Sequence, residues 1–167
     1  MRNGVGAIKW YLLAGVVVFL DQYTKGLATE HLTYARPQEV FSWFNLTLHH
    51  NTGAAFSFLD DAGGWQRYFF SIVAAGISCL LIAWLFLMQR SQWLLGLSLA
   101  LILGGAIGNL WDRVVLGYVV DFISVHYEQR YFPAFNIADA AISVGAVLML
   151  LDSFIHRDEA AQGEPSK

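Results

Sequence analysis

Two long apolar runs without a charged residue occupy the middle of the chain. Residues 68–88 form the first run and residues 93–111 form the second, and polar or charged side chains bound both of them. A helix needs about 20 predominantly apolar residues to cross the hydrocarbon core of a bilayer. Both runs therefore predict transmembrane helices.

Two further apolar segments contain charged side chains. Residues 8–28 include Asp21 and Lys25, and residues 136–155 include Asp139 and Asp152. Carboxylates inside membrane segments are costly and favour a functional interpretation. No A-x-A-like cleavage site follows the first segment, so we interpret it as an uncleaved helix and not as a signal peptide. The pattern thus predicts four spans.

Four spans place both termini on one side of the membrane. The flanks on that side hold five Lys or Arg residues, and the flanks on the other side hold four. This small excess favours cytoplasmic termini under the positive-inside rule. The tail at 157–167 is polar and contains Gly and Pro, so we expect it to be disordered.

The segments at 29–66 and 114–135 are expected on the opposite, extracytoplasmic side. Residues 45–49 alternate between polar and apolar, and residues 118–123 are β-branched and aromatic, which is typical of strands. We therefore predict one domain, an all-α membrane protein with four transmembrane helices and a small extracytoplasmic β-sheet. Five aromatic residues should then lie near the membrane interface, where amphipathic rings are favoured: Trp43, Trp65, Tyr68, Trp111 and Tyr131.

Small residues recur at four-residue spacing in the last two predicted helices. Ala100, Gly104 and Gly108 share one helix face, and Ala141 and Gly145 share another. Such faces let helices approach closely in lipid, so we interpret them as packing surfaces.

The composition supports a membrane protein and argues against a nucleic-acid partner. Of the 167 residues, 56% are hydrophobic and 14% are charged, whereas a soluble domain is about 25% charged. The net charge is −3, and the ten Lys and Arg residues form no basic stripe.

Asp121 and Asp139 are the strongest candidates for chemistry. Asp121 ends an apolar predicted strand, and Asp139 shares a face with Asn136 in the first turn of the last helix. The segment between them must double back into the membrane, which allows the two acids to meet at the interface. Two carboxylates that share a site retain one proton between them, and this is the acid–base arrangement of aspartic peptidases. Alternatively, each acid pairs structurally with an Arg or a backbone amide.

Other polar residues are predicted at the same depth. Asn109 and Arg113 share a helix face, and Asn51 and Gly53 follow the first predicted strand. These residues could position a peptide backbone, although Arg113 could instead anchor at the interface or pair with Asp112. Asp21 and Lys25 have the spacing of a helical ion pair, and we interpret them as mainly structural.

A metal site is not expected. His49 and His50 are adjacent on a predicted strand and should point to opposite faces, so the two cannot readily bind one ion. We expect neither a metal nor another cofactor.

Five segments in order resemble the lipoprotein signal peptidases, also called signal peptidase II, across most of the chain. They are DQYTK at 21–25, NTGAAFS at 51–57, GGAIGN at 104–109 followed by Asp112 and Arg113, VVDFI at 119–123 and FNIAD at 135–139. The resemblance implies a bacterial inner-membrane aspartic endopeptidase with its site at the periplasmic face and a sheet-like cradle over it. It implies a diacylglyceryl prolipoprotein substrate, cleaved on the N-terminal side of the lipidated cysteine, and inhibition by globomycin.

The resemblance also implies roles for individual residues. Asp121 and Asp139 match the catalytic pair of the family. The residues that match its substrate site are Asn51, Gly53, Asn109, Arg113 and Asn136. We expect membrane lipid as a further partner and a protein that acts as a monomer.

Two other classes of function compete with the peptidase. A component of a proton-coupled transporter also uses membrane acids, but it should spread them through the membrane, whereas Asp121 and Asp139 are expected at one end and Asp152 near the other. The absence of a visible internal repeat also counts against a transporter. A membrane scaffold without activity would tolerate Asn in place of either acid.

Overall fold

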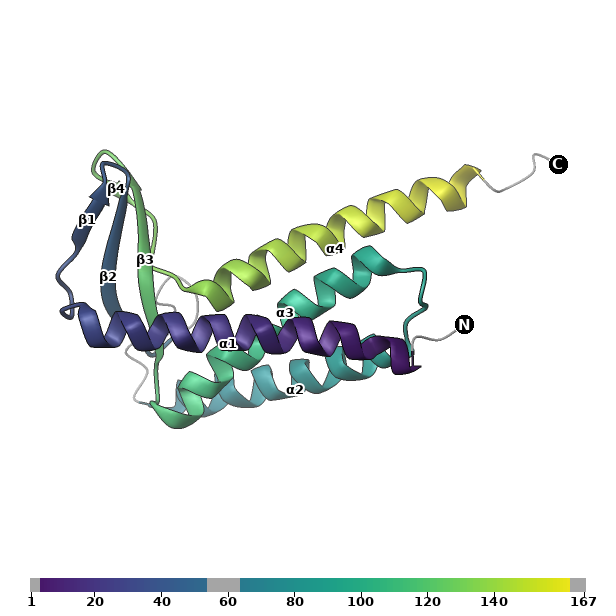
Figure 1. Ribbon diagram of the computed structural model, residues 1–167, viewed down its shortest axis with the longest axis horizontal. Helices are drawn as coiled ribbons and strands as arrows, with labels where there is room; N and C mark the ends of the chain where they lie inside the picture. The colour runs from purple at the N-terminus through teal and green to yellow at the C-terminus, as the bar shows by residue number, and fades with distance from the viewer. Residues whose placement is uncertain (1–3, 54–63, 163–167) are drawn as a thin grey trace.

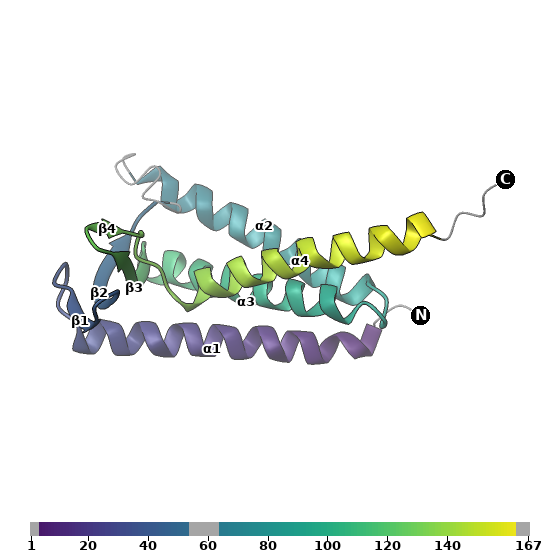
Figure 2. The ribbon, with the colours of Figure 1, turned by 90° about the horizontal axis from the view of Figure 1, so that it is seen from above.

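The protein is a four-helix bundle with a small antiparallel sheet at one end (Figures 1 and 2). The structure, a computed structural model, describes residues 4–53 and 64–162. The helices are α1 (Ile8–His31), which follows a short 3-10 turn at Gly4–Ala7, α2 (Trp65–Leu87), α3 (Trp93–Val115) and α4 (Ile137–Gln162). The strands are β1 (Gln38–Phe41), β2 (Phe44–Asn51), β3 (Val119–Tyr127) and β4 (Arg130–Tyr131).

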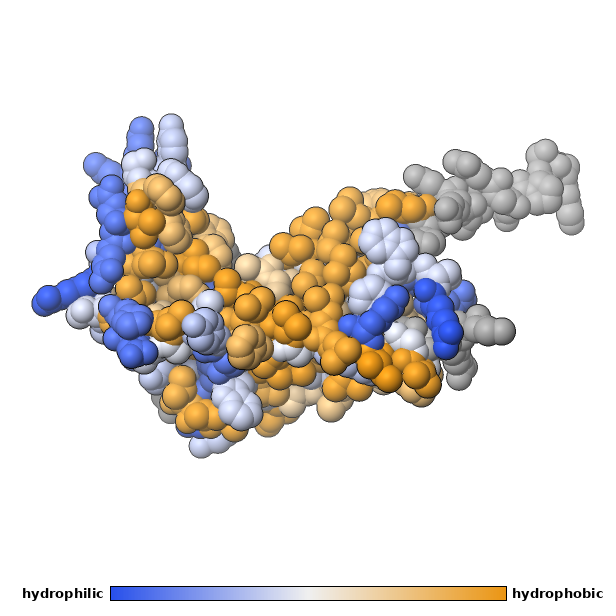
Figure 3. Space-filling view, viewed as in Figure 1, coloured by the Kyte–Doolittle hydropathy of each residue, from blue (hydrophilic) through white to orange (hydrophobic). Residues whose placement is uncertain are grey.

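Four segments in the described part of the chain are long and apolar enough to cross a membrane. They are Gly4–His31, Trp65–Leu87, Trp93–Val115 and Ile137–Ile155. Hydrophobic side chains cover the visible face of the bundle, and hydrophilic ones gather on the sheet and near the opposite end (Figure 3). The predicted fold class, four membrane helices with a small sheet, is confirmed.

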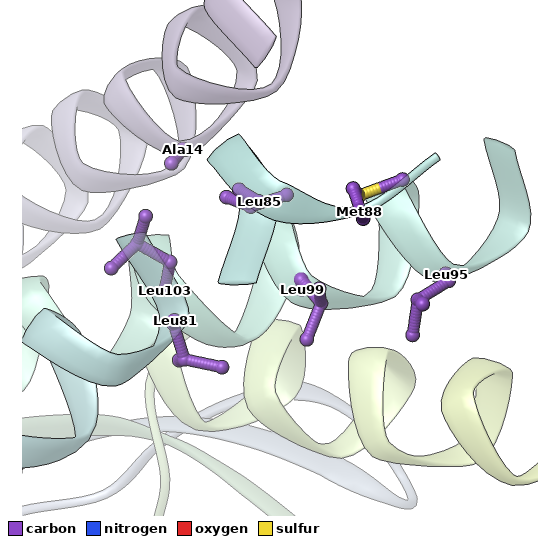
Figure 4. Packing of buried hydrophobic residues seen from close by; sticks show 7 residues of the cluster. All are labelled: Ala14, Leu81, Leu85, Met88, Leu95, Leu99 and Leu103. Atoms are coloured by element: carbon purple, nitrogen blue, oxygen red, sulfur yellow. The ribbon is translucent and has the colours of Figure 1, made fainter. Parts of the chain in front are cut away.

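Helix α3 is the centre of the bundle. In its most apolar window 56% of the residues are buried, against 17–22% in the other three spans. Leu99 and Leu103 of α3 pack with Leu85 of α2 and Ala14 of α1 (Figure 4). Because the other helices expose most of their apolar side chains, their outer faces suit contact with lipid.

Glycines on α3 allow the close approach of α1. A methyl group at Gly104 would lie 2.6 Å from Cβ of Val17 and 2.8 Å from the carbonyl oxygen of Ala14. One turn later, a methyl group at Gly108 would lie 2.5 Å from Oδ2 of Asp21. The predicted packing face at Gly104 and Gly108 is therefore present, and it brings the polar end of α1 against α3.

The sheet lies at one end of the bundle, and its strands come from the segments that connect α1 with α2 and α3 with α4. Its strand order is β1-β2-β3-β4, and all neighbours are antiparallel. The predicted strands at 45–49 and 118–123 correspond to β2 and β3, which pair His49 with Asp121. Strands β1 and β4 were not predicted, because both are short, fully exposed edge strands with no buried face to create a pattern.

Several predicted boundaries differ from the structure. Helix α1 continues to His31 instead of residue 28, α2 begins at Trp65 instead of residue 68, and α3 continues to Val115 instead of residue 111.

The prediction of a disordered tail from residue 157 is wrong as far as Gln162, because α4 continues to that residue. The sequence there contains Ala, Glu, Gln and Arg, which are strong helix formers. Residues 163–167 lie outside the described residues, as do residues 54–57 of the second motif.

Candidate active site

Asp139 lies in the first turn of α4 and is held there by Asn136. Oδ1 of Asn136 accepts a hydrogen bond from the backbone N–H of Asp139 at 2.9 Å, and Oδ2 of Asp139 is 3.4 Å from the backbone nitrogen of Asn136. This reciprocal arrangement is a capping box, in which Asn136 is the N-cap and Asp139 is the third helical residue. The start of the helix thus fixes the orientation of the carboxylate.

Asp121 lies on β3, and its carboxylate accepts two amide hydrogen bonds. The side-chain nitrogen of Asn136 donates to Oδ1 at 2.7 Å, and the side-chain nitrogen of Asn51 donates to Oδ2 at 3.0 Å. The residue is only 3% exposed. Burial and the nearby negative charge of Asp139 raise the pKa of Asp121 to about 7, although both amides favour its charged form.

The structure brings the two acids together. Asn136 contacts both of them, and the side-chain nitrogen of Asn109 donates to Oδ1 of Asp139 at 2.7 Å. Both acids are bound by amides, and neither forms an ion pair within 4.0 Å in the described part of the chain. The alternative in which each acid pairs with an Arg is therefore wrong for both.

A buried cluster from α1 and α3 lies behind the acids. Nζ of Lys25 is 2.8 Å from Oδ2 of Asp21, 2.8 Å from Oδ2 of Asp112 and 2.9 Å from Oδ1 of Asn109. Because Oδ1 of Asn109 accepts a hydrogen bond from the ammonium group of Lys25, the amide nitrogen of Asn109 faces Asp139. The predicted Asp21–Lys25 pair is confirmed, and Asp112 extends it.

Arg113 and Gly53 lie together on the other side of Asn51. Nη2 of Arg113 donates to the carbonyl oxygen of Gly53 at 2.9 Å, and Oδ1 of Asn51 accepts from the N–H of Gly53 at 3.1 Å. The alternative that Arg113 pairs with Asp112 is wrong, because its guanidinium turns toward Gly53. Nε of Arg113 is buried and has no hydrogen-bond partner among the described residues.

A cavity of about 610 Å³ opens beside these groups. Its polar wall contains Asn51, Asn109, Arg113 and Asp139, and Asp121 is hydrogen-bonded to one of these residues, Asn51. Its mainly apolar wall is formed by Val119, Phe132, Pro133, Ala134, Phe135, Ala140, Ile142, Ser143 and Val144. The cavity therefore suits an amphipathic molecule that presents a polar bond to the acids.

Sequence reasoning missed three residues that support the site. Asp112 and Gln22 belong to two of the five segments that carry the family resemblance, but Asp112 was otherwise considered only as a partner of Arg113, and Gln22 was given no role. Asp112 lies one turn after Gly108 and therefore faces α1. Gln22 donates to Oδ1 of Asp112 at 2.8 Å. Arg67 donates to the carbonyl oxygens of Arg113 and Val114 at 2.8 and 2.7 Å and so caps the end of α3. No sequence signal pointed to Arg67, because its partners are backbone groups.

The two histidines that were considered as metal ligands lie on β2, where His49 is opposite Asp121 in the sheet. His50 stacks on Tyr118 with ring centroids 4.0 Å apart, while His49 is exposed. In the part of the chain that the structure describes, no three His, Cys, Asp or Glu residues are grouped to hold a metal ion.

Comparisons with known proteins agree over nearly the whole length. Residues 13–155 match the family described as signal peptidase (SPase) II. The chain is 52% identical to a lipoprotein signal peptidase of Teredinibacter turnerae, an alignment that covers 97% of this chain and 96% of the relative. It is 55% identical to one of Acinetobacter baumannii, with 87% and 82% covered. A solved structure described as a bacterial membrane enzyme superposes with a TM-score of 0.82 at 30% identity, covering 95% of this chain and 94% of that one.

Proposed function

This chain belongs to the signal peptidase II family, and from that membership we propose that it removes the signal peptide from diacylglyceryl-modified prolipoproteins. It is a multi-pass membrane peptidase. The scissile bond is the one on the N-terminal side of the lipidated cysteine. The transporter alternative is not supported, because the relatives described above are lipoprotein signal peptidases.

Asp121 and Asp139 act as an aspartic peptidase pair in this proposal. The observation that carries it is the shared contact with Asn136, which holds one acid on a strand and the other on a helix within a buried, amide-lined site. The pKa of about 7 for Asp121 means that this acid retains its proton close to neutral pH. A pair of acids with one proton between them can serve as general base and general acid at once.

The chemical steps follow from that protonation state. The ionised carboxylate takes a proton from a water molecule as the oxygen of that water attacks the scissile carbonyl carbon. The protonated carboxyl donates a hydrogen bond to the carbonyl oxygen, which stabilises the charge that develops there. The tetrahedral intermediate then collapses, the C–N bond breaks, and a proton from the pair goes to the leaving amine.

Substrate binding divides between the two walls of the cavity. Arg113 lines the cavity and would bind the peptide backbone of the substrate. Gly53, whose N–H and carbonyl oxygen are bound to Asn51 and Arg113, would position that guanidinium group. Asn51, Asn109 and Asn136 already donate amide hydrogen bonds to the acids, so their role would be mainly to orient those acids. The apolar wall would hold lipid, since each buried CH₂ contributes about 0.8 kcal/mol.

The proposed orientation places the acids at the periplasmic face of the bacterial inner membrane. The start of α1 and the end of α4 lie at the end of the bundle opposite the sheet (Figure 1), which would be the cytoplasmic end. Exposed aromatic side chains near the sheet end, such as Trp43 and Tyr131, suit the headgroup region. As a member of the family, the protein should also be inhibited by globomycin and act as a monomer.

Cleavage of a purified prolipoprotein in detergent tests this function. The diacylglyceryl-modified substrate should be cut once, and mass spectrometry should find the lipidated cysteine at the new N-terminus. The matched control is the same prolipoprotein without the lipid, which should be cut far more slowly. Equal cleavage of both substrates, or cleavage at another bond, would contradict the proposal.

A further inference from the structure

Three buried charged side chains outside the cavity have no role in the proposed chemistry. Asp21, Lys25 and Asp112 are 0%, 3% and 1% exposed, and none of them is among the residues that line the cavity. We call them the carboxylate–lysine triad. Burying three charges is costly unless each is paired, and Lys25 pairs with both carboxylates.

Each carboxylate of the triad also accepts a backbone hydrogen bond from one of the two catalytic segments. Oδ1 of Asp21 accepts from the N–H of Ala138 at 2.9 Å, and Ala138 directly precedes Asp139. Oδ2 of Asp112 accepts from the N–H of Val120 at 3.2 Å, and Val120 directly precedes Asp121. The residue before each proposed catalytic acid is thus anchored to the same ammonium group through one carboxylate.

From this geometry we propose that the carboxylate–lysine triad positions the two catalytic acids relative to each other by holding the backbone N–H that precedes each of them. The inference rests on the proposed function. Helix α4 and strand β3 come from distant parts of the chain, so their separation near the acids is not set by local sequence. Lys25 ties the two anchoring carboxylates together and, through Oδ1 of Asn109, also orients the amide that binds Asp139.

The two anchors differ in a way that gives a sharp test. In Asp21, one oxygen binds Ala138 and the other binds Lys25. Asn at this position presents one oxygen and one amide nitrogen, so whichever donor its oxygen serves, the other donor meets an N–H group in place of an acceptor. In Asp112, Oδ2 alone binds both Val120 and Lys25, so one amide oxygen can replace it.

The remaining contact of Asp112 should tolerate the same substitution. Its Oδ1 accepts from Nε2 of Gln22 at 2.8 Å, and the same nitrogen also donates to Oδ2 of Asp21 at 3.1 Å and to the carbonyl oxygen of Gly108 at 3.2 Å, so Gln22 keeps two acceptors in Asp112→Asn. The same chemical change should therefore affect the two positions differently.

The experiment compares kcat and KM of three variants on a diacylglyceryl prolipoprotein in detergent. Asp21→Asn and Asp112→Ala should each lower kcat about 100-fold, the effect of misplacing reacting groups by about 1 Å. Asp112→Asn should retain kcat within about fivefold, and KM should change little in all three because the triad does not line the cavity. Asp152→Asn is the matched control, since it removes a buried acid of α4 far from the site and should leave kcat unchanged.

The outcomes separate this inference from the proposed function. If wild type fails to cleave, or Asp121→Asn cleaves normally, the proposed function fails. If those two behave as expected but folded Asp21→Asn has wild-type kcat, the positioning role is wrong. Equal losses for Asp112→Asn and Asp112→Ala would also overturn it, because the lost charge and not the lost acceptor would then matter. If Asp112→Ala does not fold, the contrast between the two Asn variants decides.

Discussion

The side-chain amide of Asn136 donates to Oδ1 of Asp121 at 2.7 Å, while its carbonyl oxygen accepts from the backbone N–H of Asp139 at 2.9 Å. One residue therefore caps helix α4 and orients the acid on β3. The two functions use different atoms of the same side chain, so substitution can separate them.

Asn136→Ser should keep much of the cap but lose the amide that binds Asp121. Serine is a good N-cap residue, whereas loss of the cap in Asn136→Ala should cost about 1 kcal/mol of unfolding free energy. We expect both variants to lose most of their kcat and only the Ala variant to lose the cap contribution as well. Measurements of kcat and of the thermal unfolding temperature in detergent, made on both variants and on wild type, test this prediction. Full activity of the Ser variant would show that the amide of Asn136 is dispensable.

The pH profile should report the proton held by the acids. Because burial and Asp139 raise the pKa of Asp121 to about 7, the protonated form needed for catalysis is lost as the pH rises through about 7. The value of kcat/KM should therefore fall on the alkaline side.

The same raised pKa of Asp121 lowers the free energy of unfolding as the pH rises from 3.8, the pKa of this carboxyl in the unfolded chain, toward 7, since the fold disfavours the charged carboxylate.

Asn51→Ala should move the alkaline limb of the pH profile, the fall in kcat/KM as the pH rises, to higher pH. The amide of Asn51 stabilises the ionised form of Asp121, so its removal raises the pKa of Asp121 further. The profile of kcat/KM for this variant, compared with wild type, measures the shift. A limb that stays in place or moves to lower pH would show that Asp121 does not set it.

Close packing of α3 against α1 should make Gly104→Ala destabilising. The new methyl group would collide with Val17 and with the backbone of Ala14, and such overpacking costs about 1–3 kcal/mol. Gly15→Ala on α1 is the matched control, because nothing lies within 4 Å of its new methyl group. The control should raise the unfolding temperature slightly through helix propensity. Equal effects of the two substitutions would contradict the packing found here.

Arg67 should stabilise the end of α3 next to Arg113. It donates to two carbonyl oxygens that the helix leaves unsatisfied, so Arg67→Ala should cost about 2 kcal/mol of unfolding free energy. Arg36→Ala, which removes an exposed Arg from the same side of the membrane, should cost less than about 0.5 kcal/mol. Chemical unfolding of both variants distinguishes a specific cap from a general effect of charge.

The sequence predicted the helices and the two central strands because their patterns are local. Four apolar segments and two strand-like segments suffice to derive the spans, β2 and β3. The tail was misjudged because its polar composition suits either a solvated helix or a disordered segment. Strands β1 and β4 are held by backbone pairing at exposed positions, which leaves no hydrophobic pattern in the sequence.

The two acids could be selected from the sequence, but not all of the residues that position them could be identified there. Asp121 and Asp139 stand out because carboxylates are rare beside apolar segments. The role of Asp112 depends on a backbone N–H of β3 and on Lys25 of α1, contacts between distant segments that only the fold creates. The four-residue spacing from Gly108 is the sequence signal that would have placed Asp112 on the same helix face as that packing surface.

The most direct test of the two-acid mechanism is the kcat of Asp139→Asn on a diacylglyceryl prolipoprotein, measured beside Asp121→Asn and Asp152→Asn. All three substitutions keep the shape of the side chain, and circular dichroism and thermal unfolding confirm that each variant is folded. Asp139→Asn and Asp121→Asn should each lose at least about 1,000-fold in kcat, since an amide cannot transfer the proton. Asp152→Asn should cleave normally. A folded Asp139→Asn protein that cleaves at the wild-type rate would contradict the account.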